Sequence, residues 1–256
     1  LPKELAGIGV IDIKGKMKGK FDDFLADVNL ITSEGTVNLD TRYWEEGRNT
    51  NLKGKIIAQK LNIGKFLKND DFKTLDANLL TDLQWNNKTG LSLKAKGELP
   101  QFSYKGYPYK NIKLDGTFTD NSYNGKASIR DKNGDVDFAG NIDFSKKVPL
   151  FDFESNIKNL NLTRLRIIND TNFHVISGNV SIKGQGNDLD NSTGIGKITN
   201  LVYKQNDKIY RNKEITLKSE IVDSLRQLSV LSDIADANIS GQFLISELPK
   251  IADLIG

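Results

Sequence analysis

The sequence predicts an all-β protein, built as one elongated antiparallel sheet that folds into an open trough with short helices at its rim. Apolar and polar residues alternate strictly in most segments, as in Leu75, Ala77 and Leu79, and a period of two places them on opposite faces of a strand. The links between segments are short, which requires antiparallel neighbours. Glycine recurs at apolar-face positions, which favours strong bending around that face.

Segments with this alternation follow one another along the whole chain. They cover residues 9–17, 24–30, 37–43, 52–58, 75–83, 91–99, 112–118, 123–129, 136–144, 151–157, 176–182, 197–203, 215–221 and 237–245. Between two of them, Asn133-Gly134 predicts a hairpin with a type I′ turn, because Asn and Gly tolerate positive φ. About a dozen strands spaced about 4.8 Å apart form a trough roughly 58 Å long. The inward glycines are Gly15, Gly54, Gly97, Gly116, Gly125, Gly140, Gly178 and Gly241.

Three short helices are predicted, at residues 61–67, 160–165 and 247–255, each directly after a strand. Asn62 and Asn161 are the expected N-caps of the first two. The first two helices begin 99 residues apart (160 − 61), and Tyr104 and Tyr203 share this spacing (203 − 104). We therefore expect a single elongated unit over 1–256, with internal repeats at about 1–70, 71–170 and 171–256.

Composition excludes several classes of function. The chain of 256 residues has 36 basic and 33 acidic side chains and a net charge of +3, so no strong field favours nucleic acid. Cysteine is absent, which removes thiol catalysis, disulfides and cysteine-based metal sites. No apolar run approaches the roughly 18 residues of a membrane-spanning helix. The chain begins in mid-pattern without Met, which indicates a segment of a longer protein.

No catalytic or metal-binding arrangement is recognisable. His174 is the single histidine, and no Gly-x-Ser-x-Gly turn accompanies it. The acidic pairs at 22–23, 45–46 and 70–71 lie in polar, turn-like stretches, which is typical of solvated loop charges. Residues 187–191 lack the Gly and Glu of a calcium loop. The sequence thus predicts no enzyme, no catalytic residue, no metal and no cofactor.

The apolar face itself is the predicted functional surface. Its expected groove-lining residues are Ile11, Ile13, Val28, Leu30, Val37, Leu39, Ile56, Leu79, Leu83, Leu91, Leu93, Ile112, Leu114, Phe118, Ile129, Val136, Phe138, Ile142, Phe151, Phe153, Ile157, Val180, Ile182, Leu217, Ile239 and Phe243. A surface of this kind offers acyl chains a water-free path, with each buried CH₂ contributing roughly 0.8 kcal/mol.

Two phrases of the sequence resemble a known family. Residues 54–67, GKIIAQKLNIGKFL, and residues 104–116, YKGYPYKNIKLDG, are similar to the repeat phrases of AsmA-like proteins, most closely the TamB family of Bacteroidetes. Residues 123–140 continue the same cadence. The second copy departs from it, because Arg164 and Arg166 stand where Lys and apolar residues are usual, and the segment around Tyr203 lacks the Gly-Tyr-x-Tyr phrase.

The resemblance implies a β-taco, a sheet folded lengthwise into an apolar trough. It also implies a periplasmic location in the Gram-negative envelope, as part of an inner-membrane-anchored protein, and transport of phospholipids between the inner and outer membranes. The implied partners are phospholipid acyl chains, the remainder of the same long chain and an outer-membrane barrel of the Omp85 type. Two alternatives stay open: a scaffold for assembling outer-membrane β-barrel proteins, and an adhesin or passenger built from β repeats with a dry core.

Overall fold

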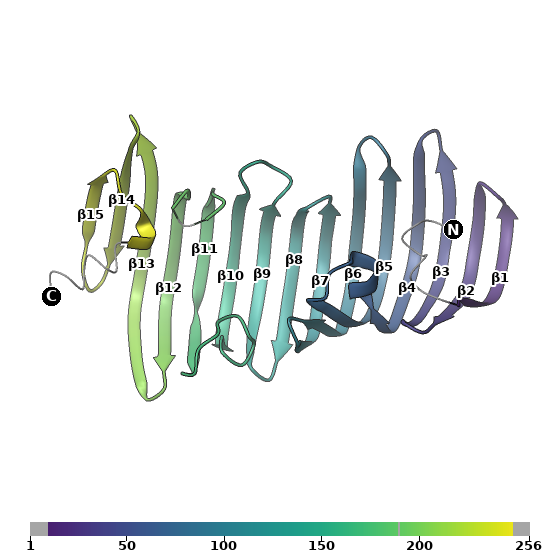
Figure 1. Ribbon diagram of the computed structural model, residues 1–256, viewed down its shortest axis with the longest axis horizontal. Coiled ribbons are helices and arrows are strands. Elements are labelled where there is room, and N and C mark those ends of the chain that lie inside the picture. The colour runs from purple at the N-terminus through teal and green to yellow at the C-terminus, as the bar shows by residue number, and fades with distance from the viewer. Residues whose placement is uncertain (1–9, 189, 248–256) are drawn as a thin grey trace.

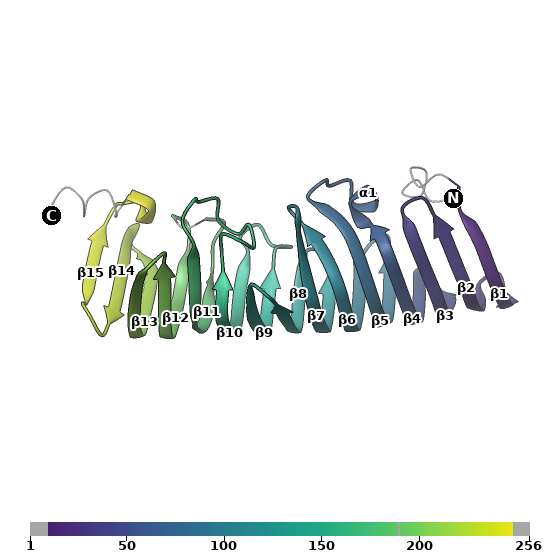
Figure 2. The same cartoon turned by 90° about the horizontal axis from the view of Figure 1, so that it is seen from below.

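The fold is one antiparallel sheet in which every strand pairs with its neighbours in the sequence. A computed structural model describes residues 10–188 and 190–247. Within them, fifteen strands follow the order β1 to β15 without a crossover (Figure 1). Seen from below, they form a single layer (Figure 2). The predicted all-β, elongated antiparallel architecture is confirmed.

The strand bounds follow the alternating segments of the sequence. The strands are β1 (Asp12–Lys20), β2 (Asp23–Thr32), β3 (Gly35–Glu46), β4 (Asn49–Asn62), β5 (Phe72–Asn86), β6 (Gly90–Tyr104), β7 (Tyr107–Thr119), β8 (Ser122–Asp131), β9 (Gly134–Asp143), β10 (Leu150–Asn161), β11 (His174–Gln185), β12 (Thr193–Gln205), β13 (Lys208–Val222), β14 (Leu225–Ser232) and β15 (Ala237–Gly241). The helical elements among the described residues are α1 (Ile63–Leu67) and the 3-10 turn η2 (Ile245–Glu247).

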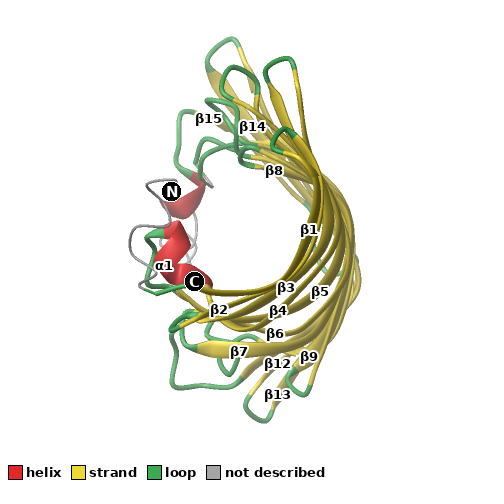
Figure 3. Ribbon diagram, turned by 90° about the vertical axis from the view of Figure 1, so that its right-hand side faces the viewer, coloured by secondary structure: helices red, strands yellow, loops and turns green. Residues whose placement is uncertain are grey.

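The sheet is bent into a trough that is open along one side. Viewed end-on, the strands lie along a common arc, and α1 lies on its open side (Figure 3). The sheet does not close, because β1 and β15 are its two edges and do not pair with each other. The predicted trough is therefore confirmed, with its concave face open to solvent in the described part of the chain.

Glycine and β-bulges allow this curvature. At Gly54, φ is +149°, and a Cβ would lie 2.2 Å from the carbonyl oxygen of Asp40, so no other residue fits without moving the backbone. Residues with φ near +50° lie in four strands, at Lys60, Asn111, Asn159 and Asn200, and the register shifts by a bulge at Lys60, Asn159 and Asn200. Such residues bend a strand and increase its twist. The sequence analysis missed all four.

The rim elements differ in part from the prediction. The first helix is confirmed as α1, although Asn62 makes no capping hydrogen bond with its side chain. Residues 160–165 end β10 and form a turn instead of a helix, in which Asn161 Oδ1 accepts a hydrogen bond from the backbone N–H of Arg164 (2.9 Å). The third predicted helix, 247–255, falls almost entirely outside the described residues.

Two local predictions were also wrong. The hairpin after β8 exists, but its two loop residues are Lys132 and Asn133, since Asp131 pairs with Gly134. Strand β14 was not predicted at all. Its alternation is blurred because Leu225 and Leu231 occupy exposed outward positions while Arg226 takes an inward one.

Very little of the molecule is buried. No large side chain in the described residues is fully buried. The chain of 28.5 kDa exposes 16784 Å², whereas a compact globular protein of that mass exposes about 11,000 Å². A single bent layer explains the difference, because one face has no second layer to cover it.

Candidate functional site: the trough and the outer groove

The floor of the trough is a row of small residues that crosses the strands in register. The row continues across β2 to β9, one residue from each strand. Its members are Ala26, Thr41, Gly54, Thr81, Ala95, Gly116, Gly125 and Gly140. Because each strand contributes one short side chain, the row forms a shallow channel along the trough's long axis. We call it the floor row.

A row of large side chains runs beside the floor row. It also takes one residue from each strand, from β2 to β10, in the same cross-strand register. Its members are Phe24, Tyr43, Leu52, Leu83, Leu93, Phe118, Tyr123, Ile142 and Phe151. On the other side of the floor row, Leu39, Ile56 and Leu79 pair in succession. The floor row is therefore bounded by apolar walls.

The predicted lining residues lie on one face of the sheet, apart from two that lie outside the strands. Ile11 precedes β1, and Phe243 follows β15. Most of the others are half-buried, while Ile13, Leu91 and Ile239 are exposed and Val28 is buried. Side chains of a closed core would be buried, so this apolar face is accessible to a ligand.

Aromatic rings narrow the trough at its centre. Ring centroids are 4.6 Å apart for Phe118 and Tyr123, 6.0 Å for Tyr123 and Phe138, and 5.3 Å for Phe138 and Phe153. The ring of Tyr123 lies over the floor row, since a Cβ on Gly116 would meet it at 2.7 Å. Burial raises the pKa of the Tyr123 hydroxyl. The rings give β7 to β10 a continuous, weakly polar lining.

The side chain of one buried arginine holds the trough wall together at its C-terminal end through hydrogen bonds. Arg226 is buried, with 7% of its surface exposed. Its guanidinium donates to Ser219 Oγ (2.5 Å), to the carbonyl oxygen of Ser192 (2.8 Å) and to the carbonyl oxygen of Asp190. The hairpin between β11 and β12 is thereby tied to β13 and β14. Beside it, a concavity of about 440 Å³ is lined in part by Arg226 and Phe243.

A strap over residues 162–173 crosses from β10 back to β7 along one rim. Leu165, at its centre, is only 2% exposed, and its carbonyl oxygen accepts a hydrogen bond from the Tyr109 hydroxyl (2.9 Å). Arg166 donates to the carbonyl oxygen of Lys105 (3.1 Å). These contacts join segments 56 and 61 residues apart in the sequence, which fixes the rim of the trough.

The single histidine fastens the end of this strap. His174 Nε2 lies 2.7 Å from Asp170 Oδ2, and its Nδ1 lies 2.5 Å from the Tyr203 hydroxyl. The pKa of the Asp170 carboxyl is lowered, first by the backbone N–H of Asn172 and then by His174. Both ring nitrogens are occupied by these two partners, which join the strap to β12, so the arrangement supports a structural role.

A second cluster of hydrogen-bonded polar side chains lies at the β8–β9 hairpin. The Tyr107 hydroxyl donates to Asp131 Oδ1 (2.5 Å), and Asn133 Nδ2 donates to the Tyr107 oxygen (2.8 Å). Burial, followed by the hydrogen bond to Asp131, raises the pKa of Tyr107 to about 12. The tyrosine is therefore neutral at physiological pH and holds the β8–β9 hairpin against β7.

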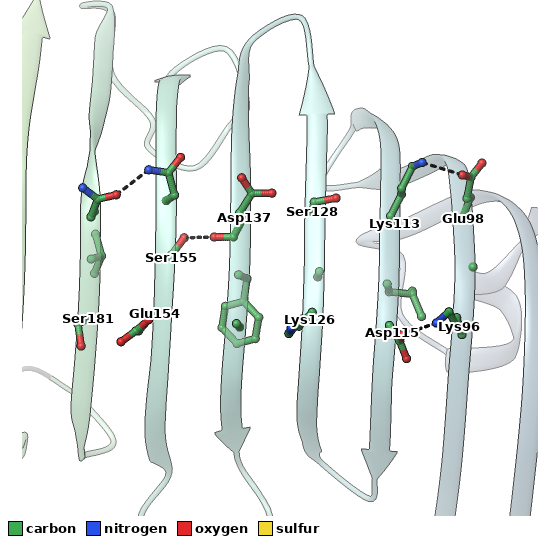
Figure 4. A pocket seen from close by; sticks show the side chains of 18 of the residues that line it. Lys96, Glu98, Lys113, Asp115, Lys126, Ser128, Asp137, Glu154, Ser155 and Ser181 are labelled. Carbon is green, nitrogen blue, oxygen red and sulfur yellow. Dashed lines mark hydrogen bonds and ion pairs between the residues drawn. The ribbon is translucent and has the colours of Figure 1, made fainter.

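A groove of about 960 Å³ crosses β6 to β12. It is bordered by two cross-strand rows of residues that alternate with those lining the trough, so the rows lie on the opposite, outer face. The first row is Lys96, Asp115, Lys126, Ala139, Glu154, Ser181 and Lys197; the second is Glu98, Lys113, Ser128, Asp137, Asn156, Asn179 and Thr199. Figure 4 labels members of both rows on β6 to β11. We call this feature the outer groove.

The trough-lining residues Leu114, Phe138 and Val180 border the outer groove only from below, between the two rows. Sequence reasoning treated the outward residues as a solvated face and missed the groove. The alternation does place them outward, but the rows emerge only once the register of seven strands is known.

Other features that would point to a specific chemistry are lacking in the described residues. They contain no group of three or more His, Cys, Asp or Glu placed to hold a metal ion. None of their helices has the length and apolar character needed to span a membrane. In comparisons with known proteins, no family model, no curated protein and no solved structure matched this chain.

Proposed function

We propose that the trough carries phospholipids, with acyl chains against the apolar face and headgroups at the open side. The observation that carries this proposal is the half-buried apolar face, which continues across the sheet with no second layer over it in the described residues. An apolar surface of this extent, rimmed by polar residues, is typical of an interaction site.

The lining is suited to a chain that slides. The floor row itself contains only small residues over eight successive strands, and the ring of Tyr123 lies over it at Gly116. Burial of methylene groups stabilises the bound chain by roughly 0.8 kcal/mol each, and this interaction has no preferred direction. Movement along the trough exchanges one apolar contact for an equivalent one.

We further propose that the chain is an internal β-taco segment of a TamB-like, AsmA-like protein. In this proposal it works in the periplasm, as part of an inner-membrane-anchored protein, and moves phospholipid between the inner and outer membranes. Its partners are the remainder of the same chain and an outer-membrane barrel of the Omp85 type. The resemblance of residues 54–67 and 104–116 to that family supports the proposal. It assigns no catalytic step and no cofactor.

A scaffold for outer-membrane barrel strands is the second candidate. The edge of β1 favours it, because β1 pairs only with β2 in the described residues and an unpaired edge offers backbone N–H and C=O groups to an incoming strand. That edge strand also carries Lys14, Lys16, Lys18 and Lys20, and lysines of this kind hinder unspecific strand addition. Cross-linking of nascent barrel strands to β1 would favour the scaffold over the conduit.

Native mass spectrometry with lipid extraction tests the conduit directly. The protein is purified without detergent from a Gram-negative host, and we expect phospholipid to co-purify with it. A lipid-free monomer would contradict the proposal and favour the scaffold or an adhesin.

A pair of substitutions then separates the two faces of the sheet. Phe138→Asp places a charge among the rings of Tyr123 and Phe153, and we expect it to abolish lipid passage, since an unpaired carboxylate in an apolar site is strongly unfavourable. Lys94→Glu changes an exposed outward residue and should leave lipid passage intact. Equal activity of both variants in a lipid-transport assay would refute the conduit.

A further inference from the structure

Strand β1 is an edge of the described sheet (Figure 1), and it carries a row of lysines on its outer face. Lysine occupies every second position after Asp12, namely Lys14, Lys16, Lys18 and Lys20. With four lysines and one aspartate, β1 has a formal charge of +3 (4 − 1 = 3), which equals the net charge of the whole chain. The rest of the chain is therefore balanced (3 − 3 = 0), so the net charge of the protein corresponds to that of this one strand.

Inside the sheet, outward charges are matched between neighbouring strands. Four ion pairs join residues that lie directly opposite each other: Lys53–Asp82 (2.9 Å), Lys96–Asp115 (2.8 Å), Lys113–Glu98 (3.0 Å) and Lys183–Asp152 (3.2 Å). Opposite charges at such positions stabilise a pair of strands, and like charges destabilise it. An outward lysine of an inner strand thus often faces an acid on the next strand.

Strand β1 departs from this arrangement. Lys14 forms an ion pair with Asp12 of its own strand (3.0 Å), whereas Lys16, Lys18 and Lys20 form no ion pair within the part of the chain that the structure describes. All nine residues of the strand are exposed. The row therefore presents uncompensated positive charge at an open edge of the sheet.

Strand β2 does not supply the missing acids. It places Asp27 opposite Lys16 and Asp23 opposite Lys20, but the Asp23 carboxylate is already held by the guanidinium of Arg42 (2.7 Å). Acids that match the remaining lysines would have to approach from the other side of β1, where its backbone has no partner among the described residues.

The trough face of β1 is equally uncovered. Ile13 and Met17 are 61% and 62% exposed, although Val28 and Ala26 on the same face of β2 are buried. The difference arises because β2 has a neighbour on both sides and β1 has one. A strand added to β1 would cover Ile13 and Met17 best with apolar residues of its own.

Charge and topology narrow the choice of occupant. A second copy is unsuited, because the outward residues of its β15, Asn238 and Ser240, are uncharged, and its β1 would bring lysine against lysine. Each described strand pairs with strands next to it in the sequence, but residues 1–9, which precede β1, contain one acid, Glu4. A separate polypeptide is the source that these observations favour.

We propose that the edge of β1 binds, by strand addition, an extended segment of another protein in which acidic and apolar residues alternate. Its backbone pairs with β1, its acids face the lysine row, and its apolar residues cover Ile13 and Met17. The lysines disfavour basic and uncharged strands at this edge, so they select the partner. The inference does not rest on the lipid conduit, because the lysines lie on the face opposite the trough.

A synthetic peptide of nine residues, the length of β1, with Glu and Val in alternation, is the probe. Its binding to the purified chain is measured by titration calorimetry at low salt and located by backbone NMR contacts. We expect saturable binding with contacts along β1. A peptide with Gln in place of every Glu should bind at least about tenfold more weakly, because it loses the cross-strand charge pairs.

Two double variants separate the lysine row from the charge of the whole protein. Lys16→Gln/Lys18→Gln removes two charges from the row, and we expect about fivefold weaker binding of the peptide. Lys55→Gln/Lys94→Gln is the matched control, since both lysines are exposed on the outer face of inner strands and form no ion pair in the described residues. Its affinity should stay within about twofold of the unmodified protein, although its net charge falls equally.

Several outcomes would overturn the inference. Equal losses in the two variants would show that overall charge attracts the peptide. Equal affinity for a peptide of the same composition with its glutamates in one block would show that alternation plays no part, and absence of saturable binding would exclude the site.

Hydrogen exchange gives an independent check. In the chain alone, we expect the β1 amides that point away from β2 to exchange freely, and the peptide should protect them. Protection without the peptide would show that the edge is already covered within the chain. None of these results bears on lipid in the trough, which lipid extraction measures separately.

Discussion

The two ends of the trough share one fold but are held together differently. From β2 to β6 the buried apolar residues on the trough face are small or aliphatic: Ala26, Val28, Ala58, Ala77 and Ala95. From β11 to β14 the buried residues are largely polar: His174, Asn212, Ser219 and Arg226, beside Leu228. The first end has small residues along its floor, with the buried Thr41 and Thr81 between apolar neighbours, whereas the second depends on hydrogen bonds at its rims.

This difference shows two ways in which a single-layered sheet is stabilised. Apolar contacts between neighbouring strands hold the N-terminal end, because small residues let the strands bend closely together. At the C-terminal end, Gly194 and Gly196 leave less side chain to pack, and Arg226 replaces the missing contacts with bonds to a hairpin. Removing the Arg226 side chain should therefore lower the stability of the protein more than removing one exposed charge.

The largest effect on stability is expected at Arg226. Arg226→Met removes the guanidinium and leaves buried oxygen atoms without donors, which should lower the free energy of unfolding by about 2–4 kcal/mol. Arg211→Met, at an exposed position of β13, should change it by less than about 0.5 kcal/mol. Denaturant unfolding measures both. Equal changes in the free energy of unfolding would show that the C-terminal end does not depend on the hydrogen bonds of Arg226.

A pair of glycines sharpens the comparison further. A Cβ on Gly125 would lie 2.4 Å from the Cα of Gly116, whereas one on Gly196 would meet nothing within 4 Å. Gly125→Ala should therefore destabilise the protein by about 1–3 kcal/mol, and Gly196→Ala should stabilise it by up to about 1 kcal/mol. The shift in unfolding midpoint for each variant decides the matter. A destabilising Gly196→Ala would mean that the open space beside Gly196 does not accommodate a side chain.

The smallest expected effect is a loss of stability at low pH. The pKa of the carboxyl is lowered at Asp143 mainly by the Ser145 hydroxyl, at Asp170 mainly by the Asn172 N–H and at Asp190 mainly by the Ser246 N–H. At the N-terminal end, Arg42 lowers the pKa of Asp23. A lowered folded pKa stabilises above the unfolded value of about 3.9, and this contribution is lost as the pH falls through the folded pKa.

Three of these four carboxylates fasten loops between β9 and η2. Below about pH 4 we therefore expect the C-terminal end to lose protection first. Hydrogen exchange, corrected for intrinsic rates and compared at about pH 6 and about pH 3, measures this order. Earlier loss of protection in β2 to β6 would reverse the comparison.

The alternation of residues predicted the meander because one period of two runs through almost every strand. Where the pattern failed, a local event changed its phase. In β4, Ala58 and Leu61 lie three residues apart yet share a face, because the bulge at Lys60 inserts one residue. Such a phase change could have been read from the sequence. The strap could not, because Leu165 is held by Tyr109, which is 56 residues away.

The site was predictable to a similar degree. The trough face follows from alternation alone, whereas the floor row and the outer groove depend on register across many strands. Register is set by turns and bulges, and the β8–β9 turn was misplaced by one residue. The repeat boundaries stay a prediction, although Asn62 N–H bonds the carbonyl oxygen of Glu34 (2.7 Å) just as Asn161 N–H bonds that of Asn133 (2.8 Å).

Site-specific photo-cross-linking in Gram-negative cells tests the central claim most directly. Leu83 and Asp82 are adjacent on β5 and face opposite sides of the sheet, since Leu83 pairs with the inward Leu52 and Leu93, and Asp82 pairs with Lys53 and Lys94. With a photoreactive residue at each position in turn, the conduit predicts phospholipid adducts at Leu83 and none at Asp82. Absence of adducts at Leu83, or equal labelling at both positions, would contradict it.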